Sequence, residues 1–122
     1  MTQEKFSWRK RAGSFRFAFS GLAMFFKTQH NALIHLAATI AVIVLSILVR
    51  LPLSSFLFIV IAIGLVWMAE LFNTAIEKLC DMVHPGQHPQ IKFIKDVSAA
   101  AVLVTAIIAV ITGCIIFIPI LL

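Results

Sequence analysis

Residues 31–49 read NALIHLAATIAVIVLSILV and residues 51–69 read LPLSSFLFIVIAIGLVWMA, with Arg50 as the single charged side chain between them. Each run is close to the ~20 apolar residues that an α-helix needs to cross the hydrocarbon core of a bilayer. Arg50 and Pro52 together end the first helix, since proline cannot continue it. The stretch therefore predicts two membrane-spanning helices, over residues 30–50 and 53–80, joined by a very short turn.

A charge-free run at the end of the chain predicts a third spanning helix, over residues 96–122. The chain of 122 residues is 61% hydrophobic and only 12% charged. Soluble domains carry roughly 45–50% apolar and about 25% charged residues, so this composition excludes a soluble globular domain. We expect an all-α membrane protein in which residues 1–122 form a single membrane-embedded domain.

Residues 1–28, ahead of the first span, mix bases with aromatic side chains. Such a segment is typical of an amphipathic helix that lies on the membrane surface. The net charge of +5 fits attraction to anionic lipid better than to nucleic acid, because the bases sit at the edges of uncharged runs. The bases are Lys5, Arg9, Lys10, Arg11, Arg16 and Lys27, and the aromatic residues are Phe6, Trp8, Phe15, Phe17, Phe19, Phe25 and Phe26.

The segment between the second and third spans, residues 81–95, contains the turn-rich sequence HPGQHP and is predicted to be a loop. Positively charged residues concentrate on the cytoplasmic side of membrane proteins. The basic N-terminal segment and this loop are therefore expected at the cytoplasmic face, with the C-terminus on the opposite side.

Acidic residues are concentrated in one part of the chain, from Glu70 inside the second span to Asp96. On a helix that advances ~100° per residue, Glu70, Asn73, Glu77 and Asp81 fall at about 0°, −60°, −20° and +20°, which predicts one polar stripe. A carboxylate near hydrocarbon costs about 2.5–3.5 kcal/mol on insertion scales and by default marks function. For Asp81 alone, a solvated helix end that pairs with Lys78 or Lys92 is an equally good interpretation.

Glu70 and Glu77 repel each other, so a cation is expected between them. The candidates are Lys95 and a divalent cation, whose preferred ligands are oxygen atoms. Carboxylates for a hard cation, a lysine for phosphate charge and a glutamate as base are the groups that phosphoryl transfer needs. The sequence Gly-x-x-x-x-Gly-Lys-Ser/Thr and a Gly-rich loop are both absent, which excludes a P-loop or a protein-kinase-like site.

The string Glu70-Leu71-Phe72-Asn73-Thr74-Ala75-Ile76-Glu77, followed by Asp81 and Lys95-Asp96, resembles the signature of the small bacterial integral-membrane diacylglycerol kinases and undecaprenol kinases. The resemblance covers the chain from about Arg11 onward. It implies a homotrimer in the bacterial inner (cytoplasmic) membrane, with active sites shared between subunits, ATP as phosphoryl donor and Mg²⁺ as cofactor. The implied acceptor is a lipid alcohol of the bilayer, namely diacylglycerol, which would become phosphatidic acid, or alternatively undecaprenol.

The resemblance also implies roles for individual residues. Glu70 matches the catalytic base, with Asn73 beside it, and Glu77 matches a carboxylate that bridges the metal and ATP. The other residues implied to bind the nucleotide are Lys10, Phe17, Gln29, Gly86, Gln87, His88, Lys95 and Asp96.

Gln29 departs from the family pattern, which commonly has a second metal-binding glutamate just before the first span. A glutamine keeps one oxygen ligand but removes a negative charge. We therefore expect Gln29 to contribute to a weaker Mg²⁺ site, unless Asp81 or an ATP phosphate compensates.

Two non-enzymatic interpretations stay open at this point. A proton- or ion-relay subunit would use Glu70 and Glu77 as a carboxylate relay, but it would not need Lys95 and Asp96 or the basic N-terminal helix. A structural scaffold would use the polar stripe only to pack subunits in an oligomer. Activity measurements on Glu70→Gln and Lys95→Ala variants separate both from a kinase.

Overall fold

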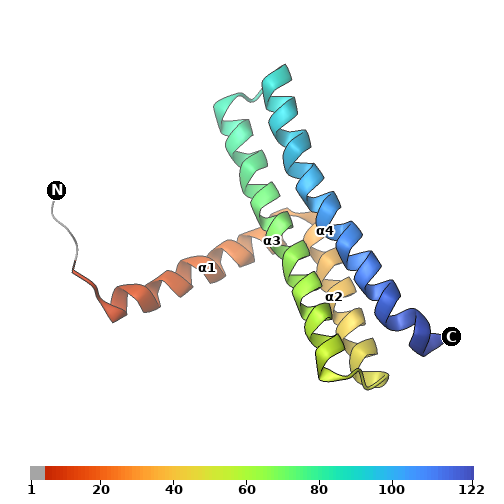
Figure 1. Ribbon diagram of the computed structural model, residues 1–122. Helices are drawn as coiled ribbons and strands as arrows, with labels where there is room; N and C mark the ends of the chain where they lie inside the picture. Colours follow the sequence, from red (N-terminus) through yellow and green to blue (C-terminus); the bar gives the residue numbers. More distant parts are fainter. Residues whose placement is uncertain (1–4) are drawn as a thin grey trace. The chain divides into compact units, whose positions relative to one another are not determined.

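The computed structural model describes residues 5–122, and within this range all regular structure is helical (Figure 1). These residues form two compact units, one ending at Leu36 and the other comprising Ala37–Leu122. The expected all-α architecture, with one N-terminal helix and three long apolar helices, is confirmed. The helices are α1 (Trp8–Thr28), α2 (His30–Leu48), α3 (Leu53–Val83) and α4 (Pro89–Leu121).

Helix α1 begins after Ser7, whose hydroxyl accepts a hydrogen bond from the backbone N–H of Lys10 at 3.5 Å. The surface helix expected over residues 1–28 therefore starts at Trp8, and residues 1–4 lie outside the described range. Most bases and aromatic side chains of α1 are exposed, with Phe25 as its one buried residue. This exposure suits a helix that lies against a membrane surface.

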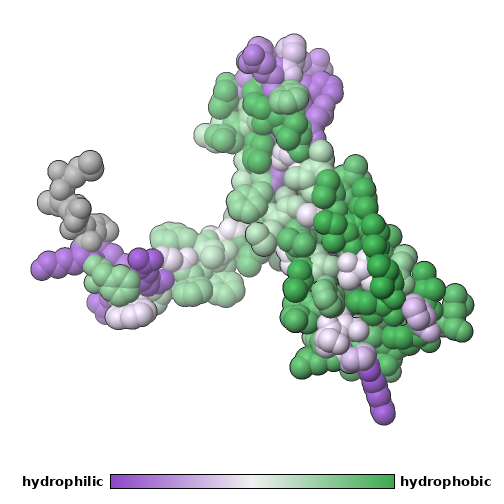
Figure 2. All heavy atoms as spheres, viewed as in Figure 1, coloured by the Kyte–Doolittle hydropathy of each residue, from purple (hydrophilic) through white to green (hydrophobic). Residues whose placement is uncertain are grey.

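Helices α2, α3 and α4 are each long and apolar enough to cross a membrane. Their large hydrophobic side chains are mostly exposed, which is the reverse of a soluble protein's core. In the space-filling view, apolar residues cover the shafts of α3 and α4, while hydrophilic residues gather at the end where these helices connect (Figure 2). The chain is therefore a membrane protein whose apolar surface faces lipid.

Helices α3 and α4 pack side by side as an antiparallel hairpin, which is the main helix pairing of the unit Ala37–Leu122 (Figure 1). Helix α2 is tied to α3 by a side-chain hydrogen bond, in which the Trp67 indole N–H donates to Thr39 Oγ1 at 2.9 Å. An indole N–H at this depth has no water to bond, so a partner on the neighbouring helix lowers its free energy.

The connection between α3 and α4 is shorter than the loop expected over residues 81–95. Helix α3 continues to Val83, and α4 already begins at Pro89, so that only residues 84–88 are non-helical. Nothing in the sequence breaks α3 before Pro85. Proline at the first position of α4 is favourable, because its missing N–H would have no partner there and its φ angle suits a helix.

The turn between α2 and α3 forces Arg50 into the left-handed region, with φ 54°. The backbone N–H groups of Leu51 and Arg50 donate to the carbonyl oxygens of Ser46 and Ile47, both at 3.1 Å. This pair of hydrogen bonds closes the end of α2 as a Schellman motif, in which the left-handed position is usually occupied by glycine.

We expect an Arg50→Gly variant to be more stable than an Arg50→Ala variant by about 1 kcal/mol, because only glycine adopts this φ without strain. Both substitutions remove the same charge, so the comparison isolates the backbone. Thermal unfolding of the purified proteins in one detergent measures the difference. Equal unfolding temperatures of the two variants would show that the positive φ at residue 50 causes no backbone strain.

Candidate functional site

The polar stripe predicted from the sequence lies on the single continuous helix α3. Glu70 is buried, with 8% of its surface exposed. Asn73 and Glu77 are half-buried, and Asp81 near the end of the helix is exposed. The stripe therefore runs from an apolar level of the helix towards its water-exposed end.

Asn73 links two other polar side chains of the hairpin. Its amide nitrogen Nδ2 donates to Glu77 Oε1 at 3.4 Å, one helical turn along α3. Its amide oxygen Oδ1 accepts from Ser98 Oγ of α4 at 2.7 Å. Asn73 thus joins the carboxylate of Glu77 to the neighbouring helix.

Lys95 pairs with the last carboxylate of the stripe. The sequence offers Lys95 as a cation between Glu70 and Glu77, but its ammonium group donates to Asp81 Oδ1 at 2.7 Å. The ion pair joins the ends of α3 and α4 that meet at the short connection, with side-chain exposures of 37% for Lys95 and 56% for Asp81. Asp81 is consequently paired across the hairpin at the exposed end of α3.

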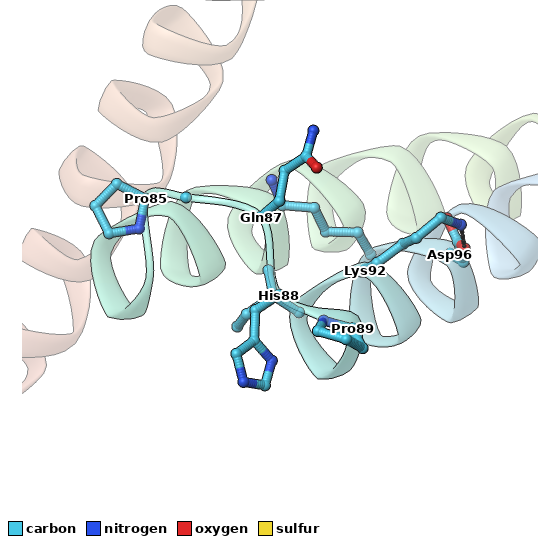
Figure 3. Close-up of a pocket in the computed structure, with 9 residues that line it drawn as sticks. Pro85, Gln87, His88, Pro89, Lys92 and Asp96 are labelled. Atoms are coloured by element: carbon cyan, nitrogen blue, oxygen red, sulfur yellow. Dashed lines mark hydrogen bonds and ion pairs between the residues drawn. The ribbon is translucent and has the colours of Figure 1, made fainter.

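A pocket of about 850 Å³ lies at the connection between α3 and α4. This volume is within the usual range of ~300–1,000 Å³ for ligand sites. Figure 3 shows Lys92 and Asp96 paired along α4 on one side, with His88 and Pro89 at the start of the helix. The pocket is lined by Pro85, Gly86, Gln87, His88, Pro89, Ile91, Lys92, Lys95 and Asp96.

The side chains of the two histidines in the connection, His84 and His88, form hydrogen bonds with its backbone. The Nδ1 atom of His88 accepts from the backbone N–H of Gln90 at 3.1 Å and so caps α4. The Nδ1 atom of His84 lies 3.1 Å from the carbonyl oxygen of Gly86, to which it can donate. The two rings meet edge to face at 5.2 Å. Gly86, Gln87 and His88 are therefore placed at the rim of the pocket by contacts within the connection itself.

The remaining residues of the expected site belong to the unit that ends at Leu36. Lys10 and Phe17 are exposed on α1. Gln29 is half-buried at the junction of α1 and α2, where its backbone N–H donates to Phe25 O at 3.0 Å and its carbonyl accepts from Ala32 N at 3.2 Å.

The described residues contain no group of three or more His, Cys, Asp or Glu side chains arranged to hold a metal ion. Glu77 offers a single carboxylate, with the Asn73 amide on one of its oxygens. That donor set fits Mg²⁺ only together with a ligand such as phosphate, which is the usual way this ion binds in kinases.

Sequence reasoning missed Ser98, and it considered Lys92 only as a partner for the carboxylates of the stripe, whereas Lys92 pairs with Asp96. Ser98 is buried, with 7% of its surface exposed, and it donates to the Asn73 amide. Its signal in the sequence is the first hydroxyl after Lys95-Asp96, at the start of a charge-free run. Lys92 has the i, i+4 spacing to Asp96 that predicts an ion pair on a helix.

Residues 16–117 match the sequence model of the prokaryotic diacylglycerol kinase family. The chain belongs to this family. This diacylglycerol kinase family member is 40% identical over 93 residues to the undecaprenol kinase of Bacillus subtilis (strain 168), and the match covers 76% of each protein. It is 39% identical over 107 residues to the diacylglycerol kinase of Synechocystis sp., over 87% of this chain and 61% of that relative.

Membership of the diacylglycerol kinase family confirms the resemblance seen in the Glu70–Glu77 motif and makes the chain a lipid kinase. ATP is the phosphoryl donor that this class of enzyme implies. Family membership as a lipid kinase removes the support for the relay and scaffold interpretations of the chain as a whole.

Proposed function

We propose that this lipid kinase transfers the γ-phosphoryl group of ATP to diacylglycerol, giving phosphatidic acid and ADP. The observation that carries the proposal is the arrangement along α3, where the buried Glu70 is followed by the Asn73–Glu77 pair and then by the charged pocket at the end of the hairpin. A membrane alcohol can reach the apolar level of this helix, and a triphosphate can reach its water-exposed end.

Glu70 is the proposed general base, with Asn73 next to it on the stripe. Glu70 takes the proton of the lipid hydroxyl as the hydroxyl oxygen attacks the γ-phosphorus in line. The bond from phosphorus to the β–γ bridging oxygen breaks, and ADP leaves with that electron pair. Burial of Glu70 limits the access of water, which would otherwise compete with the lipid as acceptor.

Mg²⁺ is the proposed cofactor, which Glu77 and phosphate oxygens of ATP would hold. When bound, it neutralises part of the triphosphate charge. The Asn73 amide bonds to Oε1 of Glu77, and this leaves Oε2 available for a cation. Gln29 is proposed to supply a second, uncharged oxygen ligand, on the strength of the family resemblance.

The pocket at the end of the α3–α4 hairpin is the proposed nucleotide-binding region. Gly86, Gln87 and His88 line its rim, where they can contact the nucleotide, and Lys95 and Asp96 line it from about two turns into α4. The positive charge of Lys95 is suited to the charge that spreads over the transferring phosphoryl group. The resemblance adds Lys10 as a basic contact and Phe17 as an aromatic contact to the adenine.

The proposed setting of the enzyme is the bacterial inner membrane. The N-terminus and the α3–α4 connection lie on the cytoplasmic side, where ATP is found. Residues 1–122 act as one lipid kinase domain, and three copies form a homotrimer with shared active sites. The distribution of Lys and Arg supports the orientation, and the family resemblance supports the trimer.

The acceptor lipid is tested directly with the purified protein in mixed micelles containing Mg²⁺ and radiolabelled ATP. Diacylglycerol and undecaprenol are offered side by side, and Glu70→Gln serves as the inactive control. We expect faster label transfer to diacylglycerol. Faster transfer to undecaprenol would replace the proposed substrate with the one that the Bacillus subtilis relative is named for, and transfer to neither lipid would overturn the proposed function.

We expect Gln29→Glu to lower the Mg²⁺ concentration for half-maximal activity by about 3–10-fold, since ligand charge count tunes the affinity of oxygen sites for divalent cations. A Mg²⁺ titration at fixed ATP measures this concentration. Asn31→Asp adds the same charge two residues away and serves as the control, for which no such change is expected. An unchanged Mg²⁺ requirement in Gln29→Glu would exclude residue 29 from the metal site.

A further inference from the structure

Ser98 makes an unusual contact for a hydroxyl in a helix. Serine and threonine side chains in helices commonly bond to a carbonyl oxygen of their own helix, as Ser46 does with Val42 O at 2.7 Å and Thr112 does with Ile108 O at 2.8 Å. The Ser98 hydroxyl instead leaves α4 and donates to Asn73 Oδ1 of α3 at 2.7 Å. Ser98 is also buried, so this bond does not compete with water.

The chemistry of the three side chains fixes the direction of their hydrogen bonds. An ionised carboxylate only accepts, so Asn73 must turn its NH₂ group towards Glu77. The amide oxygen of Asn73 then faces α4, where it needs a donor, and the Ser98 hydroxyl is that donor. The chain Ser98–Asn73–Glu77 therefore has one consistent orientation as long as Glu77 is charged.

We propose that Ser98 is a positioning residue of the kinase site, which holds the Asn73 amide so that its NH₂ group faces the Glu77 carboxylate. The proposal rests on the proposed role of Glu77 in binding the metal and ATP. Without the Ser98 hydroxyl, the amide oxygen loses its donor and the amide can rotate. A rotated amide places its oxygen against the carboxylate, which repels it and displaces Glu77 from the position suited to a cation.

The first test is the kinetics of Ser98→Ala. We expect the Mg²⁺ concentration for half-maximal activity to rise about 5–10-fold, with kcat within about twofold of wild type, because the change weakens binding rather than the proton transfer at Glu70. Ser98→Thr keeps the hydroxyl and should restore most of the affinity. Ser46→Ala removes a hydroxyl that is also buried, at 2% exposure, but bonds only within its own helix, so its Mg²⁺ dependence should match wild type.

A second test asks whether Ser98 affects the Mg²⁺ dependence through Asn73. If Ser98 acts through Asn73, then adding Ser98→Ala to an Asn73→Ala background should change the Mg²⁺ dependence no further. Additive effects in the double variant would overturn the proposal, and so would a Ser98→Ala protein that differs from wild type only in unfolding temperature.

Metal binding gives a readout that does not depend on catalysis. We expect the dissociation constant of Mn²⁺, measured by electron paramagnetic resonance with a non-hydrolysable ATP analogue, to rise about 5–10-fold in Ser98→Ala and not in Ser46→Ala. If wild type phosphorylates neither lipid but this shift is seen, the proposed function fails and the role of Ser98 stands. If wild type is active and Mn²⁺ binding is unchanged in Ser98→Ala, the role of Ser98 fails alone.

Discussion

Glu70→Gln is expected to lower kcat for lipid phosphorylation by about 10²–10⁴-fold, the usual contribution of a general base. Glutamine has nearly the same shape as glutamate, but it cannot take the proton of the lipid hydroxyl. Initial rates in mixed micelles at saturating ATP and Mg²⁺ measure the loss.

Binding of a non-hydrolysable ATP analogue provides the control for Glu70→Gln. Its affinity should stay close to wild type, because Glu70 is proposed to act on the lipid hydroxyl and is not among the residues that line the charged pocket. Glu77→Gln should show the opposite pattern, with weaker Mg²⁺ and ATP binding. If Glu70→Gln retained full activity, the buried carboxylate would have only a structural role, as the scaffold interpretation holds.

Lys95→Ala is expected to lower kcat by about 10²–10³-fold, the usual cost of removing one group that stabilises charge in a transition state. The Lys95 side chain is partly exposed about two turns into α4 and lines the pocket proposed for the nucleotide. The same micelle assay measures the loss, with the size of the purified complex checked by chromatography.

Asp81→Asn is the matched control, because it removes the ion pair but keeps the cation. Ion pairs between exposed side chains contribute at most about 1 kcal/mol, so both variants should assemble as wild type does. We expect Asp81→Asn to keep most of the activity. Equal losses in the two variants would show that the ion pair, and not the charge of Lys95, matters. ATP turnover at the wild-type rate in Lys95→Ala would exclude a role for Lys95 in the reaction.

Much of the helical framework could be predicted from the sequence, because charge-free runs of this length cross a bilayer as α-helices. The polar stripe could also be predicted, since Glu70, Asn73, Glu77 and Asp81 depend only on the period of one helix. The secondary structure of residues 81–95 was harder to predict. Its bases and prolines suggest a loop, yet Pro89 starts a helix and residues 81–83 end one.

The contacts between helices could not be predicted in the same way. The period of α3 places Asn73 on a face, but it does not say which residue of α4 lies opposite, and Ser98 was missed for that reason. The sequence offers Lys95 as a cation between Glu70 and Glu77, whereas the register of the hairpin pairs it with Asp81. Pairings of this kind depend on how far one helix is shifted along the other.

The length of α3 has a consequence for substrate selection. Its 31 residues extend about 46 Å at ~1.5 Å per residue, against a hydrocarbon thickness of about 30 Å. Glu70 and Asp81 are eleven residues apart, which is about 16 Å along this axis. In the proposed mechanism, such a helix separates its two reactants by solubility, because the oily alcohol arrives by lateral diffusion in the bilayer and the polyanion arrives from solution. Discrimination against small hydrophilic alcohols then comes from partitioning, before any pocket has to recognise the shape of the acceptor.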